Sequence, residues 1–216
     1  MSAPDPLRRA VAEDLRPVRP LLPPFRRALI LLPLAAVIVV AVPLLHFFRS
    51  DMAALGWLGS WGLSFAEAFG GVLVIALALR ESIPGRLLSG AAVGATLIVG
   101  LLVPYAVLAA TAPNFAIGAP PGAGWSDGLA CFRTSASAAI PALLASAALV
   151  FRALPVRPGM TGAIYGLGSA LIGDAGLRLF CEFTVPSHVI GAHGGAILAV
   201  VGTGVVVAKV VDWTRR

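Results

Sequence analysis

Hydrophobic positions along this chain gather into long continuous runs that short polar segments separate. The first two runs read "ALILLPLAAVIVVAVPLLHFF" and "SWGLSFAEAFGGVLVIALAL". A helix of about 20 residues crosses the roughly 30 Å hydrocarbon core of a bilayer. Because the runs do not alternate with period two, they predict helices instead of barrel strands. Six spans are predicted, over residues 28–48, 60–79, 87–110, 134–151, 161–180 and 189–211.

The composition agrees with a membrane protein. Of the 216 residues, 58% are hydrophobic and 12% are charged. We therefore predict an all-α fold, an integral membrane bundle of six transmembrane helices over residues 28–213, preceded by a short cytoplasmic helical segment over residues 1–27. No cleavable signal peptide is expected, because the first run lies behind a polar segment and lacks a small-residue cleavage site.

The basic residues predict an orientation through the positive-inside bias. Thirteen of the sixteen fall in the N-terminal segment, the second and fourth connections and the C-terminal tail, whereas Arg49, Arg133 and Arg178 fall on the opposite side. Both termini are therefore expected in the cytoplasm. The bias and anionic headgroups also account for the net charge of +6. Membrane lipids are expected partners, whereas direct nucleic-acid binding is not, since no recognition motif accompanies the charge.

The N-terminal segment begins with a helical pattern in which Leu7, Val11 and Leu15 recur every four residues. Prolines then break the pattern at Pro17, Pro20, Pro23 and Pro24. One short amphipathic helix on a stiff proline neck is predicted. It is too short to be stable alone, so we expect it to lie on the membrane surface or to dock into a groove of a partner.

The two cysteines of the chain, Cys131 and Cys181, are predicted at the same membrane level on the outer side. Three interpretations remain open. They are small hydrophobic residues that pack helices, a redox pair in a compartment where disulfides persist, or ligands of a transient metal ion together with Glu182 or His188. No CxxC or HxxxH spacing favours a preformed tetrahedral site.

Other ionisable residues are predicted near the same level. Glu67 lies in the second span, and Asp174 and Arg178 are four residues apart in the fifth, where they can pair along one helix face. Such groups normally face the bundle interior. A polar pocket in the outer leaflet is predicted, with His46, His188 and His193 near its rim. A structural ion pair and a proton relay are the two interpretations of Asp174 and Arg178.

Enzymatic activity is not expected, since the sequence has no Ser/His/Asp constellation, P-loop or dinucleotide fingerprint. A thiol oxidoreductase is disfavoured because the cysteines are isolated. A transporter of a small solute or ion, using Glu67, Asp174 and Arg178, is the alternative function, although no internal repeat is evident. No resident cofactor is expected.

Several segments resemble NrsF-type proteins, a family of six-span bacterial membrane anti-sigma factors. They are the neck "DLRPVRPL", a cysteine followed by a proline-bearing span in "CFRTSASAAIPALL", the segment "PGMTG", and the stretch from Cys181 to His193. The resemblance runs nearly from end to end, although residues 49–125 match only in hydropathy.

The resemblance implies that the chain sits in a bacterial inner membrane and holds an extracytoplasmic-function sigma factor inactive. It also implies that Cys131 and Cys181 sense thiol-reactive stress such as heavy metals or oxidants. The N-terminal segment would bind the sigma factor through Leu7, Val11, Asp14, Leu15, Arg16, Pro17 and Val18.

Overall fold

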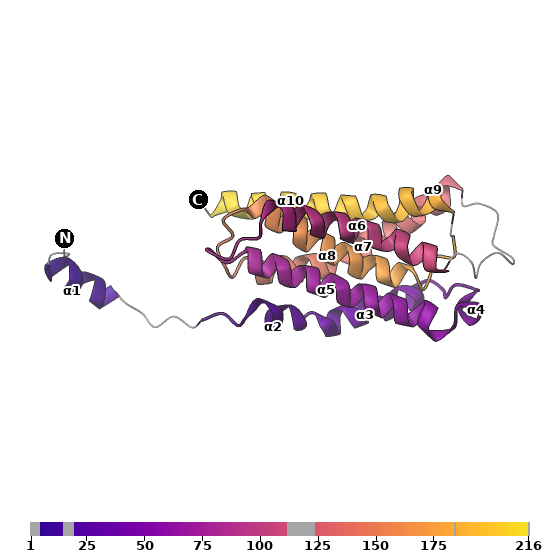
Figure 1. Cartoon of the computed structure of the whole chain (residues 1–216), viewed down its shortest axis with the longest axis horizontal. Coiled ribbons are helices and arrows are strands. Elements are labelled where there is room, and N and C mark those ends of the chain that lie inside the picture. Colours follow the sequence, from indigo (N-terminus) through magenta and orange to yellow (C-terminus); the bar gives the residue numbers. More distant parts are fainter. Residues whose placement is uncertain (1–4, 15–19, 112–123, 184, 216) are drawn as a thin grey trace.

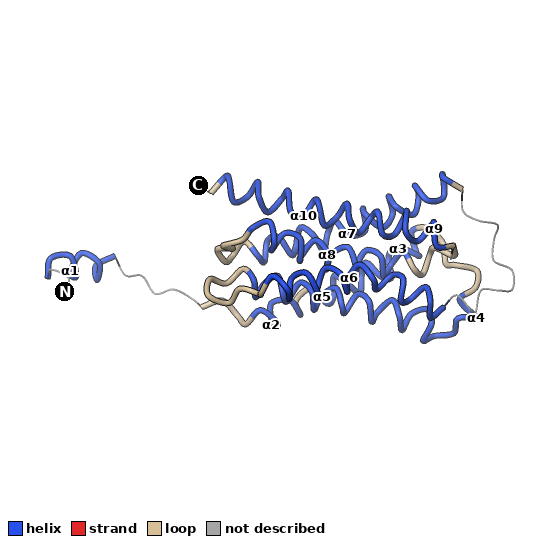
Figure 2. Tube along the Cα trace, turned by 45° about the horizontal axis from the view of Figure 1, so that its top comes forward, coloured by secondary structure: helices blue, strands red, loops and turns tan. Residues whose placement is uncertain are grey.

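The computed structural model describes residues 5–14, 20–111, 124–183 and 185–215, and this part of the chain is helical without any strand (Figure 2). The α-helices are α1 (Asp5–Asp14), α2 (Pro24–Leu29), α3 (Leu32–Leu45), α4 (Met52–Trp57), α5 (Leu63–Glu81), α6 (Gly90–Thr111), α7 (Trp125–Val150), α8 (Pro158–Leu177), α9 (Pro186–His188) and α10 (Gly195–Thr214). Two π-helical segments, η1 (Leu58–Gly62) and η3 (Val189–Gly194), lead into α5 and α10. The all-α prediction is confirmed for the described residues.

The central element of the bundle is α8, which contacts α3, α5, α6, α7 and α10 (Figure 1). Nearly every residue from Thr161 to Leu177 is buried. Glycines allow this close approach, because a Cβ on Gly168 would lie 2.5 Å from the carbonyl oxygen of Gly71 on α5. A Cβ on Gly162 would lie equally close to the carbonyl oxygen of Gly204 on α10. Small residues thus bring the backbone of α8 against those of its neighbours.

The predicted number of spans is corrected by this arrangement. By length and composition, four helical stretches of the described chain can cross a membrane: Pro24–Leu45, Met52–Glu81, Trp125–Val150 and Val189–Thr214. The helix α8, which contains glycines, serines and Asp174 and is enclosed by other helices, is not among these four stretches. Within the described residues α6 is apolar over Gly90–Val103, which is shorter than a span.

The bundle has two chemically different ends. The start of α2, the C-terminus and the connections α5–α6 and α7–α8 lie at one end, which we call the basic end (Figure 1). The buried Glu81 joins these connections. It accepts hydrogen bonds from the Leu88 N–H at 2.6 Å and from Arg157 Nε at 2.7 Å. We call this arrangement the Glu81 clasp. The opposite end carries α4, α9 and both cysteines, and we call it the cysteine end.

The N-terminal helix α1 forms before the prolines, as predicted, and Figure 1 shows it clear of the bundle, beyond the basic end. Asp14 is exposed at its end. Leu15, Arg16, Pro17 and Val18 lie outside the described residues, as do the side chains of Leu7 and Val11. The expected binding stripe therefore stays a prediction.

Candidate functional site

The two cysteines meet at the cysteine end. Cys131 lies in the second turn of α7, and Cys181 follows α8, where its backbone N–H donates to the Leu177 carbonyl at 2.7 Å. Both side chains are buried free thiols, and their Sγ atoms lie 3.5 Å apart. Leu177 and Ala192 pack around them. The sequence placed the cysteines at one membrane level, and the structure brings them into contact.

A histidine completes a three-residue cluster. Nε2 of His188 lies 3.3 Å from Sγ of Cys181. The possible ligand atoms of Cys131, Cys181 and His188 all lie within 4.8 Å of one another, and all three residues are buried. Two thiols and an imidazole at this spacing can bind a borderline or soft metal ion.

The π-helix η3 brings a second histidine beside the first. In an α-helix, residues five apart do not share a face, but a π-helix closes its hydrogen bonds between residues i and i+5. His188 precedes this wider turn and His193 lies within it, and their ring centroids lie 5.7 Å apart with a T-shaped geometry. The sequence had placed His193 near the rim of the predicted polar pocket but not among the possible metal ligands. The nearby glycines Gly191, Gly194 and Gly195 mark the irregular segment in the sequence.

Behind His193, a chain of ionisable groups runs across the bundle. Nδ1 of His193 lies 2.6 Å from Oδ1 of Asp174 on α8. The other oxygen of that carboxylate, Oδ2, accepts from Arg178 Nη2 at 3.4 Å, which is the predicted pairing of residues four apart. Arg178 Nε also donates to Glu67 on α5. We call Glu67, Asp174, Arg178 and His193 the Asp174 network.

The Asp174 network is buried. The side chains of Asp174 and Glu67 are 0% and 1% exposed, and that of Arg178 is 13% exposed. Mutual pairing makes such burial tolerable, because an isolated charge in this environment would be costly. Two polar atoms of the network, Oε1 of Glu67 and Nε2 of His193, have no hydrogen-bond partner within the described residues.

Other predicted site residues are placed elsewhere. Glu182 accepts hydrogen bonds from the backbone N–H and hydroxyl of Ser50, at 3.3 and 2.6 Å, and is not among the clustered possible ligands. His46 is exposed, and its ring lies 4.8 Å from that of Phe180. Arg49 donates to the Arg178 carbonyl at 3.1 Å. These contacts join the α3–α4 connection to the loop that carries Cys181.

The reactivity of Cys181 follows from these surroundings. The contact with Cys131 and burial raise the pKa of the Cys181 thiol above its usual value. At neutral pH Cys181 is therefore mainly a thiol, and a thiophilic metal must displace its proton.

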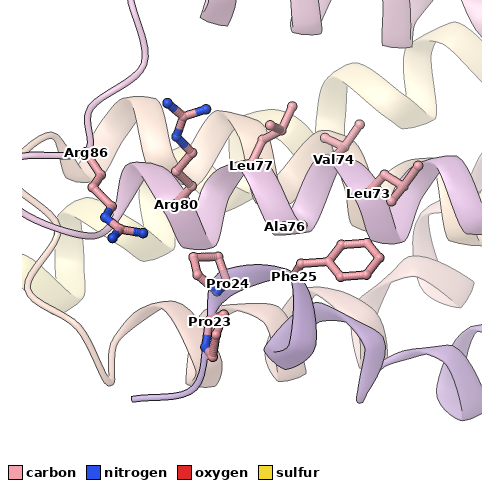
Figure 3. A pocket seen from close by; sticks show the side chains of 9 residues that line it. All are labelled: Pro23, Pro24, Phe25, Leu73, Val74, Ala76, Leu77, Arg80 and Arg86. Carbon is pink, nitrogen blue, oxygen red and sulfur yellow. The ribbon is translucent and has the colours of Figure 1, made fainter. Parts of the chain in front are cut away.

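A second feature lies at the basic end. A groove of about 480 Å³ separates the start of α2 from α5 (Figure 3). Pro23, Pro24 and Phe25 line one side and apolar residues of α5 the other, and Arg80 and Arg86 lie at one end of the groove. Its lining is apolar apart from the two arginines.

Comparison with known proteins gives one match. The protein-family model NrsF, described as "Negative regulator of sigma F", matches residues 11–213. No curated protein and no solved structure matches the chain.

Proposed function

This chain belongs to the NrsF family of negative regulators of sigma F, and from that premise we propose that it is a membrane-anchored anti-sigma factor whose cysteine end senses thiol-reactive stress. The family shows that the partner is a sigma factor. We further propose that this partner is of the extracytoplasmic-function class, and that the chain regulates without catalysing a reaction.

The exposed surface supports the membrane location. Large apolar side chains point outward along the bundle, with Leu45 81% and Leu58 79% exposed, whereas charged groups such as Asp174 are buried inside. This distribution suits contact with lipid tails. We propose a bacterial inner membrane with the basic end and both termini in the cytoplasm, following the positive-inside bias. The groove beside Arg80 and Arg86 would then face lipids of the cytoplasmic leaflet.

The N-terminal segment is the proposed binding site for the sigma factor. The family match begins at Val11, so it includes the proline neck. Because α1 is clear of the bundle, it is accessible to a partner. An amphipathic helix of this kind binds by inserting its apolar face into a groove.

The contact between Cys131 and Cys181, 3.5 Å apart across α7 and the loop after α8, is the observation that carries the sensor proposal. A bond made at these sulfurs, either a disulfide or thiolate–metal bonds, would change how α7 and the end of α8 are held. A full reversal between bound and released sigma factor requires about 5.5 kcal/mol of differential stabilisation. Covalent or metal–thiolate bonds reach this magnitude, whereas a surface ion pair does not.

The transporter alternative receives less support. Arg178 is paired with both Glu67 and Asp174, which is typical of a structural ion-pair network. A substrate site would need at least one of these charges to be available.

The sensor is tested with Cys131→Ser, Cys181→Ser and the double variant. Each variant should abolish induction of sigma-dependent transcription by a thiophilic metal or an oxidant, because a disulfide or a metal bridge needs both sulfur atoms. Membrane abundance is measured in parallel to exclude loss of the protein. Full induction at normal abundance in either single variant would disprove the paired sensor.

A further inference from the structure

Nε2 of His193 is a buried nitrogen whose bonding capacity is unused. The side chain is 6% exposed, and Nδ1 is committed to Asp174. Nε2 has no hydrogen-bond partner in the described part of the chain. The His193 ring packs against that of His188 with 5.7 Å between centroids, and with Nδ1 held by Asp174 the nitrogen left for a ligand is Nε2. His193 is not among the residues whose possible ligand atoms lie within 4.8 Å of one another, so it must move toward the other three when an ion binds. An unpartnered buried nitrogen next to the histidine of this cluster calls for a ligand.

We propose that Cys131, Cys181, His188 and His193 form a four-coordinate site for a divalent d¹⁰ cation of the Zn²⁺ type, with Asp174 as the residue that positions His193. This deepens the sensor part of the proposed function. Two thiolates and two imidazoles are a common tetrahedral donor set for such ions. With Zn–S bonds of about 2.3 Å, two sulfurs of a tetrahedron lie about 3.8 Å apart. The thiols of Cys131 and Cys181, 3.5 Å apart, are close to that spacing before any ion binds.

Asp174 orients His193 from behind, through a contact with its other ring nitrogen. Metal-binding histidines usually donate their other ring N–H to a carboxylate, which fixes the tautomer and raises the basicity of the ligand nitrogen. The 2.6 Å contact between Nδ1 and Oδ1 has this form. Arg178 and Glu67 hold Asp174 in turn, so the first ligand shell is tied to α5 and α8.

Charge and access are also suitable. Binding converts both thiols to thiolates and releases two protons to solvent, so a divalent cation with two thiolates and two neutral imidazoles forms an uncharged buried centre. A cavity of about 500 Å³ between α7 and the α9–η3 segment reaches His188. Trp125, Phe132 and Ser187 are among its lining residues, and it gives an ion a route from the cysteine end.

The test uses the full chain purified in detergent micelles, with Co²⁺ as a spectroscopic probe and Zn²⁺ as its competitor. The wild type should bind one Co²⁺, with a thiolate-to-cobalt charge-transfer band and the intense visible bands of tetrahedral Co²⁺. His193→Asn keeps a side-chain N–H for Asp174 but removes Nε2. It should shift the visible bands of bound Co²⁺, because water would replace one imidazole as ligand. It should also weaken Zn²⁺ binding by at least about 10- to 100-fold, the loss expected for Asp174→Asn.

His46→Asn is the matched control, because His46 lies at the same end but is exposed and outside the cluster. It should bind like the wild type. Helicity and elution volume verify that each variant is folded. An unchanged Zn²⁺ affinity and Co²⁺ spectrum in folded His193→Asn would overturn the four-ligand site, and so would absence of Co²⁺ binding by the wild type.

The outcomes separate this inference from the sensor proposal. Metal binding as expected with full induction in Cys131→Ser would leave the metal site standing and remove its role in sensing. Loss of induction in both cysteine variants, with metal binding insensitive to His193→Asn, would keep the sensor and remove the four-ligand site.

Discussion

The Glu81 clasp and the Asp174 network are both built on a fully buried carboxylate, yet they differ in what is left to bond. Glu81 accepts from a backbone N–H and from Arg157, whose Nη2 also donates to the Leu88 carbonyl at 2.7 Å. Asp174 is also paired, with His193 and Arg178, but Glu67 and His193 of its network each retain an unpartnered buried atom. The clasp therefore resembles a structural interaction whose carboxylate is fully hydrogen-bonded. The network instead keeps two buried polar atoms that could still bond, Oε1 of Glu67 and Nε2 of His193.

The two clusters lie at opposite ends of the same two helices, α5 and α8. The clasp joins the ends of α5 and α8 to the connection before α6, outside the middle of any long helix. The network instead lies within α5, α8 and the π-helical start of the last span. Irregular π turns in membrane helices commonly mark functional positions. The buried charges of the clasp bond only one another and the backbone, whereas those of the network also position His193 against His188.

Arg178→Ala should have the largest effect and would break the network at its only cation with a fixed charge. It leaves two buried carboxylates without their guanidinium, which costs about 3 to 5 kcal/mol of unfolding free energy. The loss can be measured as a shift of the unfolding midpoint in a denaturing detergent titration. Arg133→Ala, at an exposed position of α7, is the control and should change little. Equal midpoints for both variants would contradict a tightly coupled network.

Glu81→Ala should be milder and would sharpen the comparison. It removes the acceptor of the buried Leu88 N–H, whereas Arg157, with a side chain 30% exposed, can turn toward water. We expect a loss of about 1 to 3 kcal/mol with no change in metal affinity. Glu81→Gln should lose less, because its amide oxygen can still accept the backbone bond. A large change in Zn²⁺ binding on either substitution would show that the two ends are not separate in function.

Leu15→Asp should change the free energy of unfolding of the bundle by no more than about 0.5 kcal/mol, because Leu15 precedes the helices that form the bundle. It should nevertheless abolish co-purification with the sigma factor by placing a charge in the apolar stripe. Glu13→Lys, on the opposite face of the same helical pattern, is the matched control and should still capture the sigma factor. Undiminished capture by Leu15→Asp would move the binding site to the connection around Arg152 and Arg157.

The sequence predicted the helices and the common level of the two cysteines, because apolar run length and charge asymmetry report directly on membrane crossing. It also predicted the pairing of Asp174 with Arg178, which depends only on helical periodicity. The contact of Arg178 with Glu67 was not predictable, since it depends on how α5 packs against α8. His193 was predicted near the rim of the polar pocket, but its ring contact with His188 was not predictable because a π turn changes which residues share a face. The number of apolar spans was overestimated, since α8 contains glycines, serines and Asp174, and α6 is apolar only over Gly90–Val103 within the described residues.

The glycine contacts of α8 have a mechanical consequence. Where Gly168 meets Gly71, and Gly162 meets Gly204, backbone touches backbone without flexible side chains between them. A helix of 20 residues held in this way is stiff along its length of about 30 Å. A displacement of α8 at its cysteine end should therefore move its basic end by a similar amount, because the helix bends little.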